Sequence, residues 1–273
     1  MSAFAEAQER TRRELARLDL LATKDEVALD VVITPIGGGG TNLGPTWVVT
    51  GEANPWILDG VQHDTPLHLR MPAATREALL EGMRALGGNL AVRVLAKLGE
   101  EDGATYARVT SVEGPSSVEA LNEVVARRAQ PVTHEMPDLG VTFTLDRRLD
   151  WWRCETTPWR GRNVSFALVH RGETLPEPLI ELARDLLRRD KFWDTTVKSF
   201  AADRLLGLKN SDWLRAKQKR LTERGFKTKV KITTIVVRSD AIEFYAEDNE
   251  LFWGHTIIVY TNLEGPTRAD IAG

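Results

Sequence analysis

Residues 230–260 read VKITTIVVRSDAIEFYAEDNELFWGHTIIVY, and this stretch decides the fold of the second half of the chain. Alternate positions over residues 230–236 share one face, as they do when successive side chains point to opposite faces of a sheet. The polar pairs Ser239-Asp240 and Asp248-Asn249 interrupt the pattern with turn-forming residues. The stretch therefore predicts a three-stranded antiparallel meander that carries Phe252-Trp253-Gly254-His255 on its last strand.

The composition is that of a globular protein, with 42% hydrophobic and 27% charged residues over 273 positions. A chain of this length is most simply divided into two domains. Its apolar runs are strand-sized, so we expect no membrane-spanning segment. The N-terminal residues lack the apolar stretch of a secretory signal, and we expect a cytoplasmic protein. Cys154 is the only cysteine, which rules out an intramolecular disulfide and a cysteine-ligated zinc site.

The first half of the chain predicts, after an N-terminal helix, three strands, a helix and two strands. Amphipathic periodicity places the first helix over residues 4–21 and the second over residues 75–86, where Gly87-Gly88 ends it. The expected strands span residues 27–36, 46–50, 66–71, 90–98 and 104–112. This is the strand order of a five-stranded oligonucleotide-binding-type barrel, although other small barrels share it. We assign residues 1–130 to a helix plus a small β-barrel-like domain.

The second half predicts an α+β domain over residues 139–273. Residues 129–138 contain two prolines and little apolar periodicity, so we interpret them as a linker. Strands are expected over residues 141–145, 149–156 and 163–170, and helices over residues 174–187, 192–206 and 212–223. With the C-terminal meander, this order favours an antiparallel sheet that has its helices on one face.

Positive charge is concentrated in one segment. Residues 209–231 hold nine Lys and Arg residues and two acidic ones, a balance of 9 − 2 = +7, which leaves −3 − 7 = −10 for the rest of the chain. Lys217, Lys219 and Arg220 lie in the middle of this segment. Such a segment can steer an acidic partner or nucleic acid towards one face. The competing interpretation is a solvated helix face and a hairpin edge guarded by lysines.

Aromatic side chains provide the other candidate site. Trp151 and Trp152 are neighbours in an expected strand, so their rings point to opposite faces and one of them must leave the core. We take Trp151 as a candidate recognition residue, together with Trp253 and with His255 two positions further on. The five histidines show no spacing that puts two metal ligands on one face. No metal and no cofactor are therefore expected.

The second half also resembles a known family. The residues that carry the resemblance are LGVTFTLDRRLDW at positions 139–151, ELFWGHTIIV at 250–259 and the terminal ADIAG at 269–273. They are similar to an uncharacterised bacterial family known only as a domain of unknown function. The resemblance implies a bacterial α+β domain and transfers no catalytic residue. By analogy, related small α+β families look like immunity proteins that bind a toxin partner.

These observations favour a non-enzymatic cytoplasmic module that binds a protein partner in an immunity-like manner. One alternative is nucleic-acid binding, with the barrel as platform and residues 209–231 as the electrostatic contact. The expected barrel strands, however, offer only Trp47, Trp56 and Tyr106 for stacking on bases. A second alternative is a hydrolase centred on His255, which would need a nucleophile and carboxylates that no motif identifies.

Overall fold

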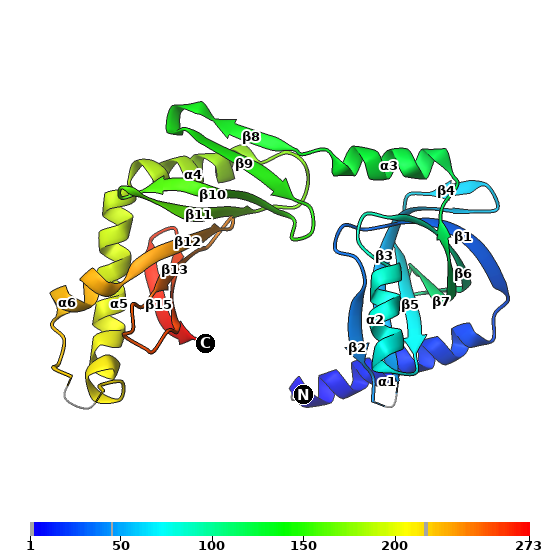
Figure 1. Cartoon of the computed structure of the whole chain (residues 1–273), viewed down its shortest axis with the longest axis horizontal. Helices are drawn as coiled ribbons and strands as arrows, with labels where there is room; N and C mark the ends of the chain where they lie inside the picture. Colours follow the sequence, from blue (N-terminus) through cyan, green and yellow to red (C-terminus); the bar gives the residue numbers. More distant parts are fainter. Residues whose placement is uncertain (1–2, 45, 216–217) are drawn as a thin grey trace. The chain divides into compact units, whose positions relative to one another are not determined.

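The computed structural model describes residues 3–44, 46–215 and 218–273, and it divides into two compact units, Met1–Pro131 and Val132–Gly273 (Figure 1). Each unit is built on its own sheet and its own hydrophobic core. Helix α3 (Glu119–Ala129) is the last element of the first unit.

The first unit is a closed barrel. Its strands are paired in the order β1-β6-β7-β5-β3, and β3 pairs with β1 again to close the ring. All pairs in the ring are antiparallel except β5 with β7, which is parallel. This is the oligonucleotide-binding-type strand order that the sequence predicts. The ring strands are β1 (Glu26–Ile33), β3 (Trp47–Leu58), β5 (Leu67–Ala73), β6 (Ala91–Glu101) and β7 (Ala104–Pro115).

Two short strands and two helices complete the first unit. Strands β2 (Gly39–Asn42) and β4 (Val61–His63) both pair with β3. Helix α2 (Arg76–Ala85) begins at Thr75, whose hydroxyl caps the helix by accepting the Ala78 N–H. Its buried face packs on β3 and β5 through Leu79 and Gly82. Helix α1 (Ala3–Ala22) packs against the outside of the barrel through Leu15 and Leu18.

The second unit is a single sheet in the order β15-β14-β13-β12-β11-β10-β9-β8. Its neighbours are antiparallel except β11 and β12, which are parallel because the helices lie between them in the chain. The strands are β8 (Thr133–Met136), β9 (Val141–Asp146), β10 (Trp151–Trp159), β11 (Arg162–Val169), β12 (Lys231–Val237), β13 (Ile242–Glu247), β14 (Thr256–Asn262) and β15 (Gly265–Ala272). The expected sheet is confirmed, with one parallel pair that the sequence analysis does not foresee.

Two further differences concern the strands. The expected linker over residues 129–138 contains edge strand β8, because Met136 alternates with exposed residues and is buried against the core. The meander also has a fourth strand, β15, which pairs with β14 along its length. Residues 251–255 are not part of a strand and belong to the turn before β14.

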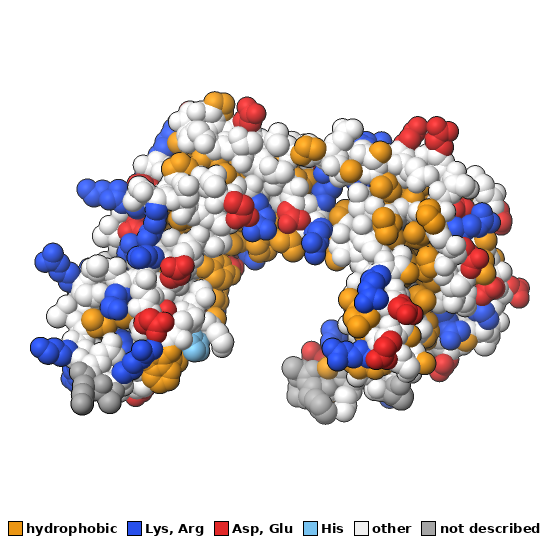
Figure 2. All heavy atoms as spheres, in the orientation of Figure 1, with side chains coloured by type: hydrophobic (Ala, Val, Ile, Leu, Met, Phe, Trp, Pro, Cys, Tyr) orange, Lys and Arg blue, Asp and Glu red, His pale blue; other side chains and the backbone are white. Residues whose placement is uncertain are grey.

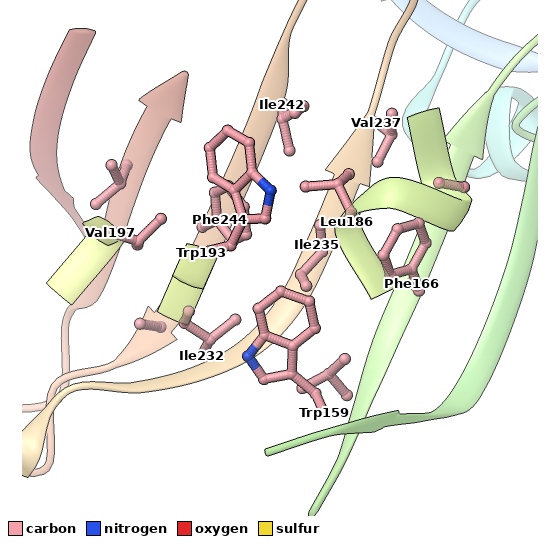
Figure 3. Packing of buried hydrophobic residues seen from close by; sticks show 14 of the residues in the cluster. Trp159, Phe166, Leu186, Trp193, Val197, Ile232, Ile235, Val237, Ile242 and Phe244 are labelled. Atoms are coloured by element: carbon pink, nitrogen blue, oxygen red, sulfur yellow. The ribbon is translucent and has the colours of Figure 1, made fainter. Parts of the chain in front are cut away.

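The helices cover one face of this sheet, as the sequence predicts (Figure 1). They are α4 (Glu177–Arg188), α5 (Asp190–Ser211) and the short α6 (Glu223–Lys229). Figure 3 shows side chains of α4 and α5 meeting those of the strands. The Trp193 and Phe244 rings are stacked with centroids 6.0 Å apart, and the Trp159 ring lies 6.2 Å from Phe244. Large aromatic rings buried in this way contribute much of the hydrophobic stabilisation of a core.

Two of the expected helix boundaries are wrong. Helix α5 continues through Gly207 to Ser211, because Leu205 and Lys209 keep one side of it buried and a lone glycine costs only about 1 kcal/mol. The described part of residues 212–222 is not helical. Here the Asn210 side-chain amide donates to the Leu221 carbonyl (2.9 Å), and its oxygen accepts the Leu221 N–H (2.8 Å). These bonds hold Leu221 against the end of α5.

A search of the described residues for a helix both long and apolar enough to cross a membrane finds none.

Gly82 in α2 and Gly207 in α5 provide a matched test of the packing. A Cβ atom at Gly82 would lie 2.8 Å from Val49 Cγ2, whereas one at Gly207 meets no atom within 4 Å. We expect Gly82→Ala to destabilise the first unit by about 1–3 kcal/mol through overpacking. Gly207→Ala should stabilise the second unit by up to about 1 kcal/mol through helix propensity. Chemical denaturation of both variants measures these changes, and a stabilising effect of Gly82→Ala would contradict the packing of α2 on the barrel.

Candidate functional site

The sheet of the second unit has a face that its own helices leave uncovered. Strand alternation puts Trp152, Ile235, Phe244 and Val259 into the core, so the residues next to them in sequence point to the opposite side. We call this side the open face. Its large side chains come from β10, from β13–β15 and from the residue that follows β12; they are Trp151, Arg153, Arg238, Glu243, Tyr245, Tyr260, Arg268 and Asp270.

The strand register connects these residues into rows across the sheet. One row runs through direct cross-strand partners in the order Arg153, Ala167, Val236, Glu243, Tyr260, Arg268. In a parallel row, Tyr245 faces Ile258, and Ile258 faces Asp270. Directly opposed residues on one sheet face have neighbouring side chains. The large polar and aromatic groups of the open face are therefore contiguous, around a floor of small and aliphatic residues.

Each arginine of the open face has a carboxylate close to it. Arg153 contacts Glu155 at 2.7 Å and Asp146 at 3.7 Å, Arg238 contacts Glu243 at 3.3 Å, and Arg268 contacts Asp270 at 2.9 Å. Two arginines also lie over rings, with Arg268 at 4.1 Å from the Tyr260 centroid and Arg238 at 6.0 Å from that of Trp151. The open face consequently carries many charged groups but little surplus charge of either sign.

Tyr245 is held in its neutral form. Its hydroxyl donates a hydrogen bond of 2.6 Å to the Glu243 carboxylate, and the side chain is partly buried. Burial, followed by this hydrogen bond and the negative charge of Glu243, raises the pKa of Tyr245 to about 12. A phenol kept neutral beside a carboxylate is a hydrogen-bond group and not a base at neutral pH.

The two adjacent tryptophans take opposite sides, as alternation requires. Trp152 is only 1% exposed, and its indole N–H donates to the Gly172 carbonyl at 3.2 Å. Trp151 is half-buried on the open face, next to Arg238. Of the two rings, Trp151 is therefore the one that a ligand can reach.

Trp253 and His255 do not lie on a strand, which corrects the expectation that they share a strand face. The buried Asp248 carboxylate instead accepts the backbone N–H groups of Glu250 (3.1 Å), Phe252 (2.5 Å) and Gly254 (3.3 Å), which bends residues 248–254 into a loop. Asn249, Glu250 and Trp253 have positive φ in this loop. Such a conformation does not belong to a regular strand.

The aromatic loop forms a second, separate cluster. The Trp213 ring lies 4.8 Å from Trp253 and 5.2 Å from His255, and Trp253 is 51% exposed. The loop follows Glu247, which pairs with Lys231 at the start of β12, whereas Arg238 beside Trp151 follows the end of β12. Trp151 therefore lies near the end of β12, whereas the Trp253–His255 pair lies near its start. Within the described ranges, no carboxylate is hydrogen-bonded to the His255 side chain.

Part of the basic segment is engaged within the unit. Lys209 is fully buried, where its Nζ donates to the Trp213 carbonyl and to Gln218 Oε1 (3.1 Å), and burial lowers its pKa. Arg215 pairs with Glu250 at 2.7 Å, and Lys227 pairs with Glu223 at 2.7 Å. Lys209 therefore cannot serve as an electrostatic contact for a polyanion.

Of the three cations singled out in the sequence, Lys219 and Arg220 are exposed, and Lys217 lies outside the described residues. Arg220 lines a hollow of about 590 Å³ between α5 and α6. Lys and Arg side chains stand along the edge that α4, α5 and α6 form (Figure 2). They belong to the helical side of the unit, away from the open face.

The aromatic residues of the barrel are also engaged. Trp56 is 4% exposed and stacks on His63, and the Arg17 guanidinium of α1 lies 3.9 Å from the Tyr106 ring centroid. Arg70, which faces Arg108 across the β5–β7 pair, contacts the Glu14 carboxylate of α1. Helix α1 thus covers part of the barrel surface that the nucleic-acid alternative requires.

Sequence reasoning missed most of the open face. Glu243, Tyr245 and Tyr260 alternate with buried residues in the predicted strands, so their common face could have been found from the period of two. Arg268 could not, because β15 was not predicted. Arg153 adjoins the tryptophan pair but has no distinctive signal of its own.

The raised pKa of Tyr245 gives a test of the open-face geometry. Because its folded pKa of about 12 exceeds the ordinary tyrosine pKa of 10.0, the folded state keeps a proton that the unfolded state loses between these values. The free energy of unfolding should therefore fall as the pH rises from about 10 to about 12. Ultraviolet titration of the phenolate, with Tyr245→Phe to assign it, measures the pKa directly. Glu243→Gln should lower this pKa; an unchanged value would contradict the hydrogen bond.

Comparison with known proteins yields a family for one half of the chain. No curated protein matches the sequence. One similar solved structure is a deletion mutant of the single-stranded DNA binding protein from Thermus aquaticus, with 13% identity, a TM-score of 0.22, and coverage of 52% of this chain and 74% of that one. A family model matches residues 137–271, almost the whole second unit. The second half of the chain is thus a domain of the bacterial family described as "Uncharacterized protein conserved in bacteria (DUF2262)".

Proposed function

We propose that the protein is a non-enzymatic binding module of a bacterial cell, and that its partner is a protein that docks on the open face of the second unit. The observation that supports this proposal best is the one-sided cover of the sheet. Helices bury one face, whereas the other presents Trp151, Tyr245 and Tyr260 among arginines. An immunity-like pairing with a single protein partner is the form that the family analogy favours.

The residue types of the open face support a protein partner. Trp, Tyr and Arg are the residues most enriched at the energetic centres of protein interfaces. They bury a large area at a small cost in side-chain entropy when their positions are already restricted. Arg268 over Tyr260 and the Tyr245–Glu243 hydrogen bond restrict their side chains in this way before any partner binds.

The charge balance of the open face favours a protein over a polyanion. Nucleic-acid binding draws most of its affinity from cations that neutralise phosphates. On the open face, the Arg153, Arg238 and Arg268 side chains each contact a carboxylate already. A phosphate backbone would meet these carboxylates as well, whereas a protein surface can match alternating charges.

Loss of binding on mutation of the open face tests the proposal. Trp151→Ala, Tyr260→Ala and Arg268→Ala, combined in one variant, should reduce recovery of the partner from the native lysate by at least about tenfold, because such residues concentrate binding energy. The matched control combines Arg189→Ala, Phe192→Ala and Arg204→Ala on the helical side, which removes similar side chains that are about half exposed. Affinity purification with quantitative mass spectrometry compares the variants.

The control variant should recover the partner as the unmodified protein does. The proposal fails if the open-face variant retains every protein that the unmodified chain recovers, or if the control loses the same proteins. Circular dichroism of both variants verifies that each second unit is folded.

Nucleic-acid binding is a second candidate because the barrel has the strand order of oligonucleotide-binding barrels. Lys219, Arg220 and Arg224 are exposed and available to phosphates. Fluorescence anisotropy with single- and double-stranded oligonucleotides at low salt tests it, and an affinity that falls steeply with added salt would favour it over the protein partner.

A further inference from the structure

The first unit contains a pocket that the proposed function does not use. Its volume is about 710 Å³, within the range of about 300–1,000 Å³ typical of small-ligand sites. It is formed by the β3–β4 hairpin, the start of β5 and the β6–β7 hairpin. Its lining residues all belong to the first unit, so the pocket shares no residue with the open face.

Aromatic rings form one side of the pocket. The Trp56 and His63 rings are stacked almost in parallel, with centroids 3.9 Å apart and an angle of 9° between the planes. The indole N–H of Trp56 donates to the Thr65 carbonyl at 3.0 Å, which fixes the ring. His68 also lines the pocket, and its ring lies 5.0 Å from that of Tyr106. The pocket therefore offers π surfaces held in place by the barrel.

The remaining walls are apolar and acidic. Leu58, Pro66 and Leu98 supply aliphatic surface, and Glu100 supplies a carboxylate. A second carboxylate, that of Glu52, lies 3.8 Å from His68 Nδ1. Among the described residues that line the pocket there is no lysine or arginine. A phosphate or carboxylate ligand would thus meet negative charge without a fixed cation to balance it.

We infer that this pocket binds a guanidinium group carried on an aliphatic stem. A planar guanidinium stacks on aromatic faces and forms paired hydrogen bonds with a carboxylate. Here the flat cation would lie against the His63–Trp56 stack and donate to Glu100. Its methylene stem would lie along Leu58 and Leu98, which would bury apolar surface. A free guanidino metabolite and an arginine side chain of a peptide share this chemistry.

The geometry favours a guanidinium over a neutral ring. A neutral base could stack on His63, but it would leave Glu100 without an opposite charge. An ammonium ion would satisfy the carboxylate, but its tetrahedral shape does not match a flat ring face as a guanidinium does. The stack, the carboxylate and the aliphatic walls together match one ligand class.

Calorimetric titration of the full chain tests the inference with four probes. Agmatine represents a free guanidino compound, and N-acetyl-arginine amide represents a peptide side chain. N-acetyl-citrulline amide has nearly the same shape without the charge, and adenosine monophosphate represents a nucleotide. At least one guanidinium probe should bind at least about tenfold more tightly than the citrulline probe, the ratio expected when a cation–π contact and a charged hydrogen bond are lost together.

Whichever guanidinium probe binds more tightly shows whether the ligand is a free guanidino compound or an arginine side chain of a peptide. Either result supports the site. The inference is overturned if neither binds below about 10 mM, a free energy too small for a specific site. It is also overturned if citrulline binds as tightly as arginine, or if the nucleotide binds more tightly than both guanidinium probes.

Substitutions in the pocket show whether the guanidinium probes bind there. Glu100→Gln and His63→Ala should each lower the affinity for the guanidinium probe by about tenfold, because each substitution removes one of the contacts named above. Glu123→Gln on the exposed side of α3 changes the net charge as Glu100→Gln does and should leave the affinity unchanged. If His63→Ala fails to fold, the exposed Glu100 still provides the test. Equal affinity of Glu100→Gln and the unmodified chain places the binding elsewhere and overturns the inference.

Discussion

The packing of α4 and α5 against one face of the eight-stranded sheet is the interaction on which the second unit depends. Trp152, Trp159, Phe166 and Phe244 all point to that side, where the helices remove them from water. Burying large aromatic and aliphatic side chains provides the main favourable free energy of folding. Because a strand alternates its side chains, the same packing places every other residue on the opposite side. The open face is thus a direct consequence of the one-sided core.

The open face stays compatible with water because its polar groups satisfy one another. Arg238 and Arg268 contact carboxylates, and the Tyr245 hydroxyl donates to Glu243. Meanwhile Ala167 and Val236 fill the floor of the row and are almost completely covered by their neighbours. A surface built in this way is ordered before a partner arrives, which lowers the entropy cost of binding. The barrel pocket has a different character, because no lysine or arginine stands beside its stacked rings and its carboxylate among the described lining residues.

Local pattern was a good guide where burial follows a regular period. The elements of the barrel and the opposite directions of Trp151 and Trp152 follow from periods of 2 and 3.6 residues, and the order of these elements along the chain indicated the barrel and the one-sided helices. Pattern was a poor guide where single side chains redirect the backbone. Asp248 gathers three backbone N–H groups and converts residues 248–254 into a loop, and Asn210 holds Leu221 out of a helix. Such contacts depend on residues that meet only in the folded chain.

The amino-acid sequence by itself therefore determined the class of fold and the membership of the second half in its family. It also determined that one of the adjacent Trp151 and Trp152 leaves the core, since strand geometry points neighbouring side chains to opposite faces, and the structure shows that this residue is Trp151. Only the tertiary structure decided that Trp253 and His255 lie away from Trp151, that Lys209 is buried, and that Trp56 and His63 stack beside a pocket. The physical reason is that periodicity reports which side of an element faces the core, whereas a site requires side chains from distant elements to meet in space.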